Sequence, residues 1–190
     1  MKQLILSMTS KIYSQNDVLL NKLLNFYYTD DNLNIMLSII NGTSKVSLRI
    51  VDWFSTNYSK KYYTIYETPN NPRFKAYEDY KLKLKAYSKK RFDPFCRWDR
   101  IQVPITENSE YCFETTIGQL NFFKWALENK IIDYIKTHYD VIEKDMNENN
   151  SISRTKSLKH DNSRKKREEL SVNAIKTFKK EKVEITVTFS

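Results

Sequence analysis

The chain has 190 residues, of which 40% are hydrophobic, 14% aromatic and 29% charged, and it carries a formal net charge of +9. This length and composition suit one domain with a sizeable core, which the large rings help to fill. Only two glycines occur, Gly42 and Gly118, which excludes the glycine-rich loops that hold phosphates in P-loop and dinucleotide-binding proteins.

The two cysteines, Cys96 and Cys112, are too few for a disulfide framework, so we expect free thiols in a reducing compartment. The apolar run near the N-terminus is too short for a signal peptide. No later run reaches the roughly eighteen apolar residues that a membrane span needs. We therefore expect a soluble protein with no transmembrane segment.

Residues 1–46 are predicted to form an N-terminal helical segment. Asp17 is the expected N-cap of its first helix, whose apolar residues are Val18, Leu19, Leu20, Leu23, Leu24 and Tyr27. The apolar run over residues 33–40 is either a buried helix or a strand, because its periodicity does not decide between them. Asn41 and Gly42 then form a turn.

Residues 47–146 are predicted to form an α+β core domain. Ser47 is the expected cap of a helix to about Tyr58, and a strand at 62–66 and a loop at 69–72 follow. Residues 81–85 alternate like a strand, but the apolar residues of a longer window recur at steps of three or four. This spacing predicts a helix over about 74–90 whose core residues are Phe74, Tyr77, Tyr80, Leu84 and Tyr87.

The second half of this domain is predicted to contain a strand and two helices. The strand covers 98–105, and Pro104 near its end indicates an edge strand. Thr116 and Gln119 have the spacing of a capping box at the start of a helix that ends near Asn129. The next helix is expected over 131–146, with His138 on its inner face.

The C-terminal part is predicted to be a polar linker (147–163) followed by a basic helix and a strand (164–190). The strand is indicated by the alternation of Val183, Ile185, Val187 and Phe189 with polar residues. A lone strand is not stable, so it must pair with the chain's own sheet or with a neighbour. The expected fold is therefore α+β, with four to five helices packed on a small, mostly antiparallel sheet and a C-terminal strand after a polar tether.

The positive charge is concentrated in two blocks. Residues 81–100 hold eight basic and two acidic side chains, residues 151–182 hold eleven and four, and the remaining chain is net negative. Many of the commonest residues have A/T-rich codons, which explains an excess of lysine but not its uneven distribution. The simpler interpretation of each block is a solvated helix face.

A helix over residues 74–90 places Lys81, Lys85 and Lys89 on one exposed stripe, which the basic residues from 90 to 100 extend. Such a stripe can follow a phosphate backbone, because lysine and arginine displace condensed counterions. Trp98 is a candidate for stacking on unpaired bases, whereas Phe92 and Phe95 are better explained as loop anchors. The predicted nucleic-acid-binding residues are Lys81, Lys85, Lys89, Lys90, Arg91, Arg97, Trp98, Arg100, Lys165, Lys166 and Arg167.

Catalytic chemistry is hard to find in this sequence. The candidate metal ligands, Cys96, Cys112, His138 and His160, lack the short spacing of zinc sites. Acid–base catalysis needs carboxylates that converge in space, which sequence alone does not show; the candidates are Asp52, Asp93, Asp99 and Glu114. We expect a non-enzymatic protein that uses no metal or cofactor.

Four stretches carry a family resemblance: SLRIVDWFSTNYSKK (47–61), YKLKLKAYSKKRFDPFCRWDRI (80–101), ETTIGQLNFFKWALENKIIDYI (114–135) and RKKREELSVNAIKTFKKEKVEITVTF (164–189). Together they resemble an uncharacterised protein family of giant nucleocytoplasmic DNA viruses, mimivirus-like and related lineages. The resemblance covers most of 47–189 and leaves 1–46 outside. It implies a viral protein, located in the viral factory of the host cytoplasm or in the virion. The basic cluster at 164–167 also fits a nuclear import signal, which makes the host nucleus an alternative.

Two hypotheses about function follow. The first is a non-enzymatic viral protein that binds DNA or RNA through the phosphate backbone with low sequence specificity. The second is a virion structural or assembly protein. Its basic blocks bind acidic partner proteins, and residues 183–189 add a strand to a neighbour or mediate self-association.

Overall fold

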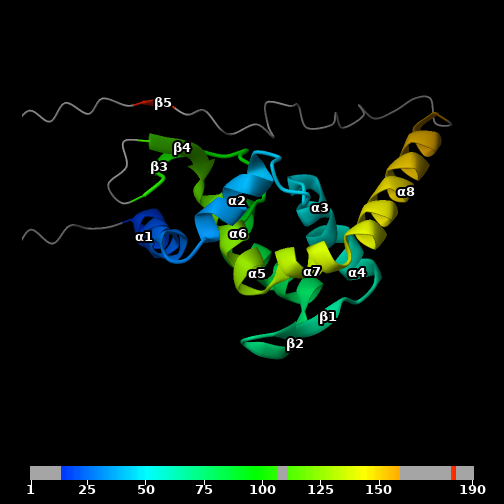
Figure 1. Cartoon of the computed structure of the whole chain (residues 1–190). Coiled ribbons are helices and arrows are strands. Elements are labelled where there is room, and N and C mark those ends of the chain that lie inside the picture. Colours follow the sequence, from blue (N-terminus) through cyan, green and yellow to red (C-terminus); the bar gives the residue numbers. More distant parts are fainter. Residues whose placement is uncertain (1–13, 107–110, 159–180, 183–190) are drawn as a thin grey trace, which may run out of the picture.

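The structure is a computed structural model that describes residues 14–106, 111–158 and 181–182 (Figure 1). Its helices are α1 (Gln15–Tyr28), α2 (Asn32–Ile40), α3 (Leu48–Trp53), the π-helical turn η1 (Phe54–Tyr58), α4 (Ser59–Lys61), α5 (Ala76–Arg91), α6 (Ile117–Glu128), α7 (Ile131–Thr137) and α8 (Tyr139–Leu158). The strands are β1 (Ile65–Thr68), β2 (Asn71–Lys75), β3 (Arg100–Pro104), β4 (Tyr111–Thr116) and β5 (Glu181–Lys182). The predicted α+β class is confirmed. The described part has more helices than expected, partly because two predicted helices are divided.

The strands form two separate antiparallel sheets, a β1–β2 hairpin and a sheet of order β3–β4–β5. Figure 1 places the hairpin and the β3–β4 pair on different sides of the helical body. Pro104 ends β3, which is an edge strand as predicted. Tyr111 and Cys112 of β4 pair with Lys182 and Glu181, so this part of the tail adds to the chain's own sheet. The predicted helix 166–179 and strand residues 183–189 lie outside the described residues.

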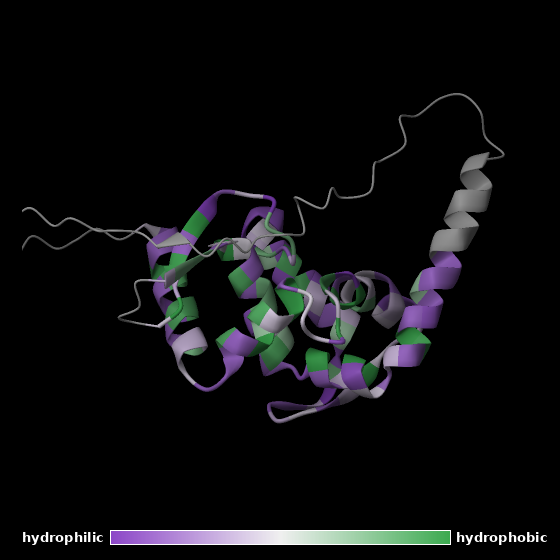
Figure 2. Ribbon diagram, turned by 45° about the horizontal axis from the view of Figure 1, so that its top comes forward, coloured by the Kyte–Doolittle hydropathy of each residue, from purple (hydrophilic) through white to green (hydrophobic). Residues whose placement is uncertain are grey.

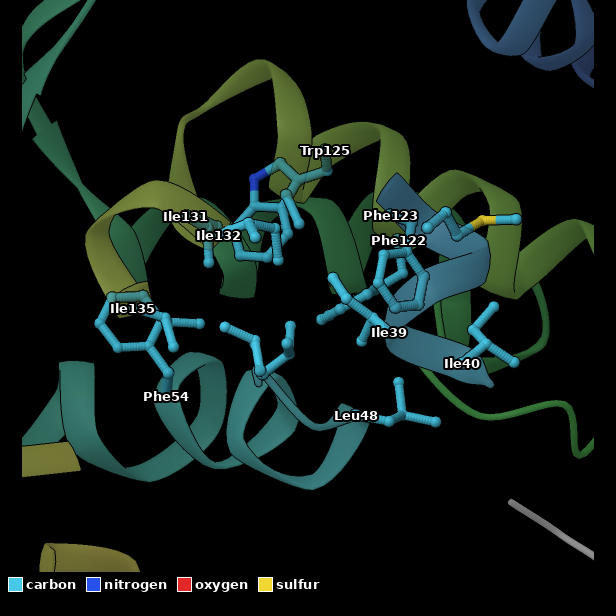
Figure 3. Close-up of a cluster of buried hydrophobic side chains, with 14 of the residues drawn as sticks. Ile39, Ile40, Leu48, Phe54, Phe122, Phe123, Trp125, Ile131, Ile132 and Ile135 are labelled. Atoms are coloured by element: carbon cyan, nitrogen blue, oxygen red, sulfur yellow. The ribbon is translucent and has the colours of Figure 1, made fainter. Parts of the chain in front are cut away.

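Helix α6 forms the centre of the core. Thr116 caps it by accepting a hydrogen bond from the Gln119 amide at 3.0 Å, and it ends at Asn129, as predicted. The Gln119 side chain does not complete the capping box; it donates instead to the Pro94 carbonyl at 2.9 Å. Because α1, α2, α5 and α7 all contact α6, most of its side chains are buried. Figure 3 shows Phe122 and Phe123 beside Ile39 of α2 and Trp125 closer to Ile131 and Ile132 of α7. Figure 2 shows most hydrophobic residues on the central helices.

Aromatic contacts join the hairpin to the helices. The Tyr134 ring of α7 lies 4.7 Å from the Tyr66 ring of β1 and 5.3 Å from the Phe54 ring of η1. The Tyr66 hydroxyl also donates to the Asn129 carbonyl at 2.9 Å. Aromatic pairs of this kind contribute about 0.5–1.5 kcal/mol each beyond their buried area. They hold a two-stranded hairpin that is only marginally stable alone.

Each of the three tryptophans donates its indole N–H to an aspartate carboxylate. For Trp53 and Trp125 the acceptor is distant in sequence and lies on another helix, so these two hydrogen bonds join pairs of helices. The pairs are Trp53 with Asp145 at 2.9 Å, Trp98 with Asp93 at 3.2 Å, and Trp125 with Asp79 at 2.6 Å.

The N-terminal helices differ from the prediction in one cap. Ser14, not Asp17, is the N-cap of α1: its hydroxyl accepts from the Asp17 amide at 3.2 Å, and the Asp17 carboxylate accepts from the Ser14 amide at 2.9 Å. Asp17 is therefore the second half of a capping box. Residues 33–40, left undecided above, belong to helix α2 and bury Leu33, Met36, Ile39 and Ile40.

The predicted helix 131–146 is divided at His138, which has non-helical backbone angles between α7 and α8. His138 is exposed rather than inward-facing, and its ring stacks on Tyr134 with centroids 4.1 Å apart. Helix α8 then continues through Leu158, so residues 147–158 of the predicted linker are helical. Residues 159–163 lie outside the described part.

Candidate nucleic-acid interface

Helix α5 presents the first basic block. Ala76 is fully buried at its start, and Tyr80, Leu84 and Tyr87 pack against the core, which supports the helical interpretation of this segment. The prediction that Tyr77 belongs to this core face is wrong. Ala76 already occupies the inward position, and the next residue turns away by about 100°. Tyr77 instead lines hollows on the surface.

The helix is interrupted at Ser88, whose φ of 60° and ψ of 168° are non-helical. A residue other than glycine in this region costs roughly 1–3 kcal/mol, which neighbouring contacts must offset. The following chain crosses the start of α6, where the Asp93 amide donates to the Gly118 carbonyl at 3.2 Å. A Cβ atom on Gly118 would lie 2.9 Å from the Lys90 carbonyl, so glycine permits this crossing.

The interruption changes the predicted lysine stripe. Lys81 and Lys85 are one helical turn apart and exposed, but Lys89 follows the break at Ser88. It therefore does not continue their row, and the prediction of one regular stripe through Lys89 is wrong. The Asn121 side chain donates to the Arg91 carbonyl at 2.9 Å and fixes the redirected segment on α6.

Asp93 is a buried acceptor that organises residues 93–98. Its side chain is 3% exposed and accepts two hydrogen bonds from the Arg97 guanidinium, at 2.9 and 2.8 Å. It also accepts from the Phe95 amide at 3.1 Å and from the Trp98 indole. Buried carboxylates need such compensation. Phe95 and Phe92 are buried as loop anchors, as expected, whereas Trp98 keeps 42% of its surface exposed.

Two more basic residues of the block are paired with acids. Lys90 lies 2.7 Å from the Asp99 carboxylate, and Arg100 pairs with Glu114 across β3 and β4. No acidic partner within 4.0 Å is found, among the described residues, for a second set of basic side chains. These are Lys81, Lys83, Lys85, Lys89 and Arg91.

The structure therefore separates the predicted site residues that pair with acids in the fold from those that do not. The Arg97 side chain pairs with the buried Asp93, whereas the Lys90–Asp99 pair is exposed and is expected to contribute little to stability. Lys81, Lys85 and Lys89 are exposed, and within the described part of the chain no carboxylate lies within 4.0 Å of their ammonium groups. Lys165, Lys166 and Arg167 lie outside the described residues, so their role stays a prediction.

Sequence reasoning missed a second group of side chains beside α5. A hollow of about 370 Å³ is lined by residues of α4, β1 and α5, among them Lys60, Tyr63 and Tyr77. A neighbouring hollow of about 690 Å³ on α5 shares Tyr77 and Glu78 and adds Lys81, Leu82 and Lys85. The run Lys60-Lys61-Tyr62-Tyr63 is the signal in the sequence. The predicted strand over 62–66 is wrong for its two rings, because Tyr62 and Tyr63 follow α4 and β1 begins only at Ile65.

The two free cysteines show no reactive arrangement. Cys96 is buried, and burial raises the pKa of its thiol to about 11, which keeps it protonated at neutral pH. Cys112, in β4, is half-buried. Over the described side chains, no three histidine, cysteine or carboxylate groups gather closely enough to hold a metal ion.

Asp52 on α3 lies near Asp93, so two of the candidate carboxylates do converge. Burial raises the pKa of Asp52 to about 6; the negative charge of Asp93 adds to this shift and the Arg97 guanidinium opposes it. A carboxyl group whose pKa is higher in the folded than in the unfolded state destabilises the fold once it ionises. Stability contributed by protonated Asp52 is therefore lost as the pH rises from about 4 to about 6.

Replacing Asp52 by asparagine is expected to raise the free energy of unfolding by about 1–2 kcal/mol at pH 8 and to change it little at pH 4. Urea unfolding at both pH values measures the difference. Asp140→Asn is the control, because the Asp140 side chain is 93% exposed. An equal effect of Asp52→Asn at both pH values contradicts the prediction.

Sequence comparison shows that the chain belongs to a family of proteins. The family of unknown function DUF7197 matches residues 4–188, so this chain is a member. This match includes most of residues 1–46, which the resemblance described above left outside. The resemblance to a giant-virus family is confirmed by a curated relative, an uncharacterised protein of Acanthamoeba polyphaga mimivirus. The two sequences are 45% identical over 137 residues, which cover 68% of this chain and 53% of the relative.

The chain thus spans about half the length of this relative, and the two share a viral family. No solved structure matches the chain. Among the helices of the described part, none is long and apolar enough to cross a membrane.

Proposed function

We propose that this protein is a non-enzymatic viral nucleic-acid-binding protein with low sequence specificity. The observation that supports this best is the uneven pairing of the basic block. Arg97, Lys90 and Arg100 have acidic partners. Three other lysines of α5 are exposed and have no acidic partner within 4.0 Å among the described residues: Lys81, Lys85 and Lys89. Unneutralised charges in a cluster repel one another, and phosphate groups relieve that repulsion.

The helix dipole explains part of this positive charge without a ligand. Lys89, Lys90 and Arg91 lie in the last turn of α5, where cations interact favourably with the helix dipole. That interaction does not account for Lys81 and Lys85 in the middle of the helix. These two lysines are therefore the central phosphate contacts of the proposal, and Lys89 and Arg91 add to them.

A salt titration tests the proposal. Contact with four to five phosphates of duplex DNA predicts that log K falls with log salt at a slope of about −4. Fluorescence anisotropy of a labelled duplex between about 50 and 200 mM salt measures this slope. Substitution of Lys81, Lys85 and Lys89 by glutamate is expected to abolish binding. Absence of binding at the lowest salt, or a slope near zero, overturns the proposal.

A charge-matched control separates this site from the net charge. Lys22, Lys136 and Lys144 are exposed on α1, α7 and α8, and their substitution by glutamate changes the net charge equally. This control is expected to retain most of the affinity. If both triple variants lose it equally, binding depends on overall charge and the α5 site is wrong.

The assembly hypothesis depends on residues 183–189 and on acidic partner proteins. Those residues lie outside the described part, so the hypothesis stays a prediction. Light scattering of the full chain and of a chain ending at residue 182 tests it. A stable oligomer that the shorter chain loses supports assembly through this strand, and a monomer in both cases contradicts it.

A further inference from the structure

The hollows beside α5 combine aromatic rings with lysines. Both α4 and β2 contact α5, and Figure 1 shows these elements close together near the hairpin. Four lysines and one glutamate line the hollows together with the exposed Tyr63 ring, the half-buried Tyr77 ring and apolar side chains. The lysines are Lys60, Lys75, Lys81 and Lys85, and the glutamate is Glu78, which pairs with Lys75 at 3.1 Å.

Tyr63 is held in solvent by an unusual helix end. The Thr64 amide donates to the Ser59 carbonyl at 3.1 Å, the 6→1 bond of a Schellman motif, and Tyr63 has a φ of 46°. Glycine is the usual residue here, because a Cβ atom in the left-handed region costs roughly 1–2 kcal/mol. Tyrosine takes this position although 81% of its surface is exposed. The fold therefore presents a large ring that neither its packing nor its backbone requires.

Tyr77 lies beside two ammonium groups. The Nζ atom of Lys60 is 5.8 Å from the centroid of its ring, and that of Lys81 is 6.0 Å away. Tyr77 also belongs to the walls of both hollows. A ring flanked by cations matches one nucleotide unit, in which a flat base is joined to a phosphate.

We infer that this surface, formed by Tyr63, Tyr77, Lys60, Lys81 and Lys85, binds single-stranded nucleic acid by stacking bases on the two tyrosines. The inference rests on the proposed function and specifies its ligand. In a duplex the faces of the bases are hidden, so a lysine surface for duplex DNA gains nothing from exposed rings. A single strand uses both the rings and the lysines.

Exposed apolar side chains beside lysines also occur on surfaces that bind anionic membranes. Leu82 is 65% exposed and Ile65 is 47% exposed, so this alternative has some support. The hollows decide in favour of a single strand. Tyr77 lines both hollows and has two lysine ammonium groups about 6 Å from its ring centroid, whereas a lipid surface meets protruding side chains.

The test uses the full chain, a labelled 20-nucleotide oligo(dT) and a duplex of the same length in an anisotropy titration. We expect tighter binding of the single strand. Tyr63→Ala and Tyr77→Ala are each expected to weaken it about 10-fold and to leave duplex binding nearly unchanged. Tyr63→Phe and Tyr77→Phe keep the ring and are expected to retain the affinity.

Other outcomes distinguish a failure of the stacking inference from a failure of the proposed function. Equal affinity for both nucleic acids, with no effect of the alanine variants, overturns the stacking inference. The proposed function survives that result if the Lys81, Lys85 and Lys89 variant still loses binding. Binding of phosphatidylserine-containing vesicles without binding of either oligonucleotide overturns both. Circular dichroism of every variant checks that lost binding does not result from unfolding.

Discussion

Replacement of Asp145 by alanine is expected to lower the free energy of unfolding by about 3 kcal/mol at pH 7. Its side chain is 4% exposed and accepts hydrogen bonds from Lys61 at 2.5 Å, Trp53 at 2.9 Å and Tyr62 at 3.1 Å. These bonds tie α8 to the α3–η1–α4 segment. Alanine leaves the partly buried indole N–H without its acceptor and removes the charge that Lys61 faces.

This loss should depend on pH. Burial on its own raises the pKa of Asp145, but the hydrogen bonds from Lys61, Trp53 and Tyr62 outweigh burial and hold the pKa below its ordinary value. A lowered pKa contributes stability above the unfolded-state value of about 3.9, and this contribution is lost as the pH falls through the folded-state value. The difference between the wild type and Asp145→Ala should therefore shrink below about pH 4.

Urea unfolding followed by circular dichroism at pH 7 and at pH 3 measures both parts of the prediction. Asp140→Asn on the same helix is the control and should change stability by less than about 0.5 kcal/mol, because that side chain is 93% exposed. A difference for Asp145→Ala that is independent of pH contradicts the assigned role of its charge.

Asp93→Ala is expected to cost about 3 kcal/mol, because it removes the acceptor of four hydrogen bonds in one turn of chain. Arg97 is 41% exposed and regains water, which limits the cost. The control is Asp99→Ala, whose carboxylate is 81% exposed in its pair with Lys90 and should contribute little.

A double-mutant cycle isolates the ion pair. Asp93→Ala and Arg97→Ala, alone and together, should give a coupling energy above about 1 kcal/mol. Urea unfolding of the four proteins provides the data. Additive effects of the two substitutions would show that the carboxylate stabilises the loop through the Phe95 amide and the Trp98 indole instead.

Local signals predicted much of the helical part of this fold. The hydroxyl of Thr116 and the apolar spacing after it define α6, and Ser47 caps α3 by accepting from the Ile50 amide. The long window correctly outweighed the short alternation of residues 81–85, but its start is wrong, because Phe74 belongs to β2 and α5 begins at Ala76. These features depend on residues within a few turns of one another, which a single sequence displays.

The features that shape the candidate site depend on distant residues. Ser88 lies just before the segment that crosses Gly118, thirty positions later in the sequence. The residues around Ser88 contain no pattern that predicts this crossing. Tyr77 satisfies the core spacing as well as Tyr80 does, but the hairpin before it decides which of them turns inward. For the same reason, charge composition identified the basic block but did not show which of its residues Asp93 and Asp99 neutralise.

The three tryptophan–aspartate pairs provide a set of built-in optical reporters. Indole emission moves to longer wavelengths as water reaches the ring, and Trp125 is 3% exposed whereas Trp98 is 42% exposed. Proteins that keep one tryptophan at a time would report on separate contacts: α3 with α8, the 93–98 loop, and α5 with α6. Emission from a protein that retains only Trp98 would report on the 93–98 loop, which follows α5, without a contribution from the core.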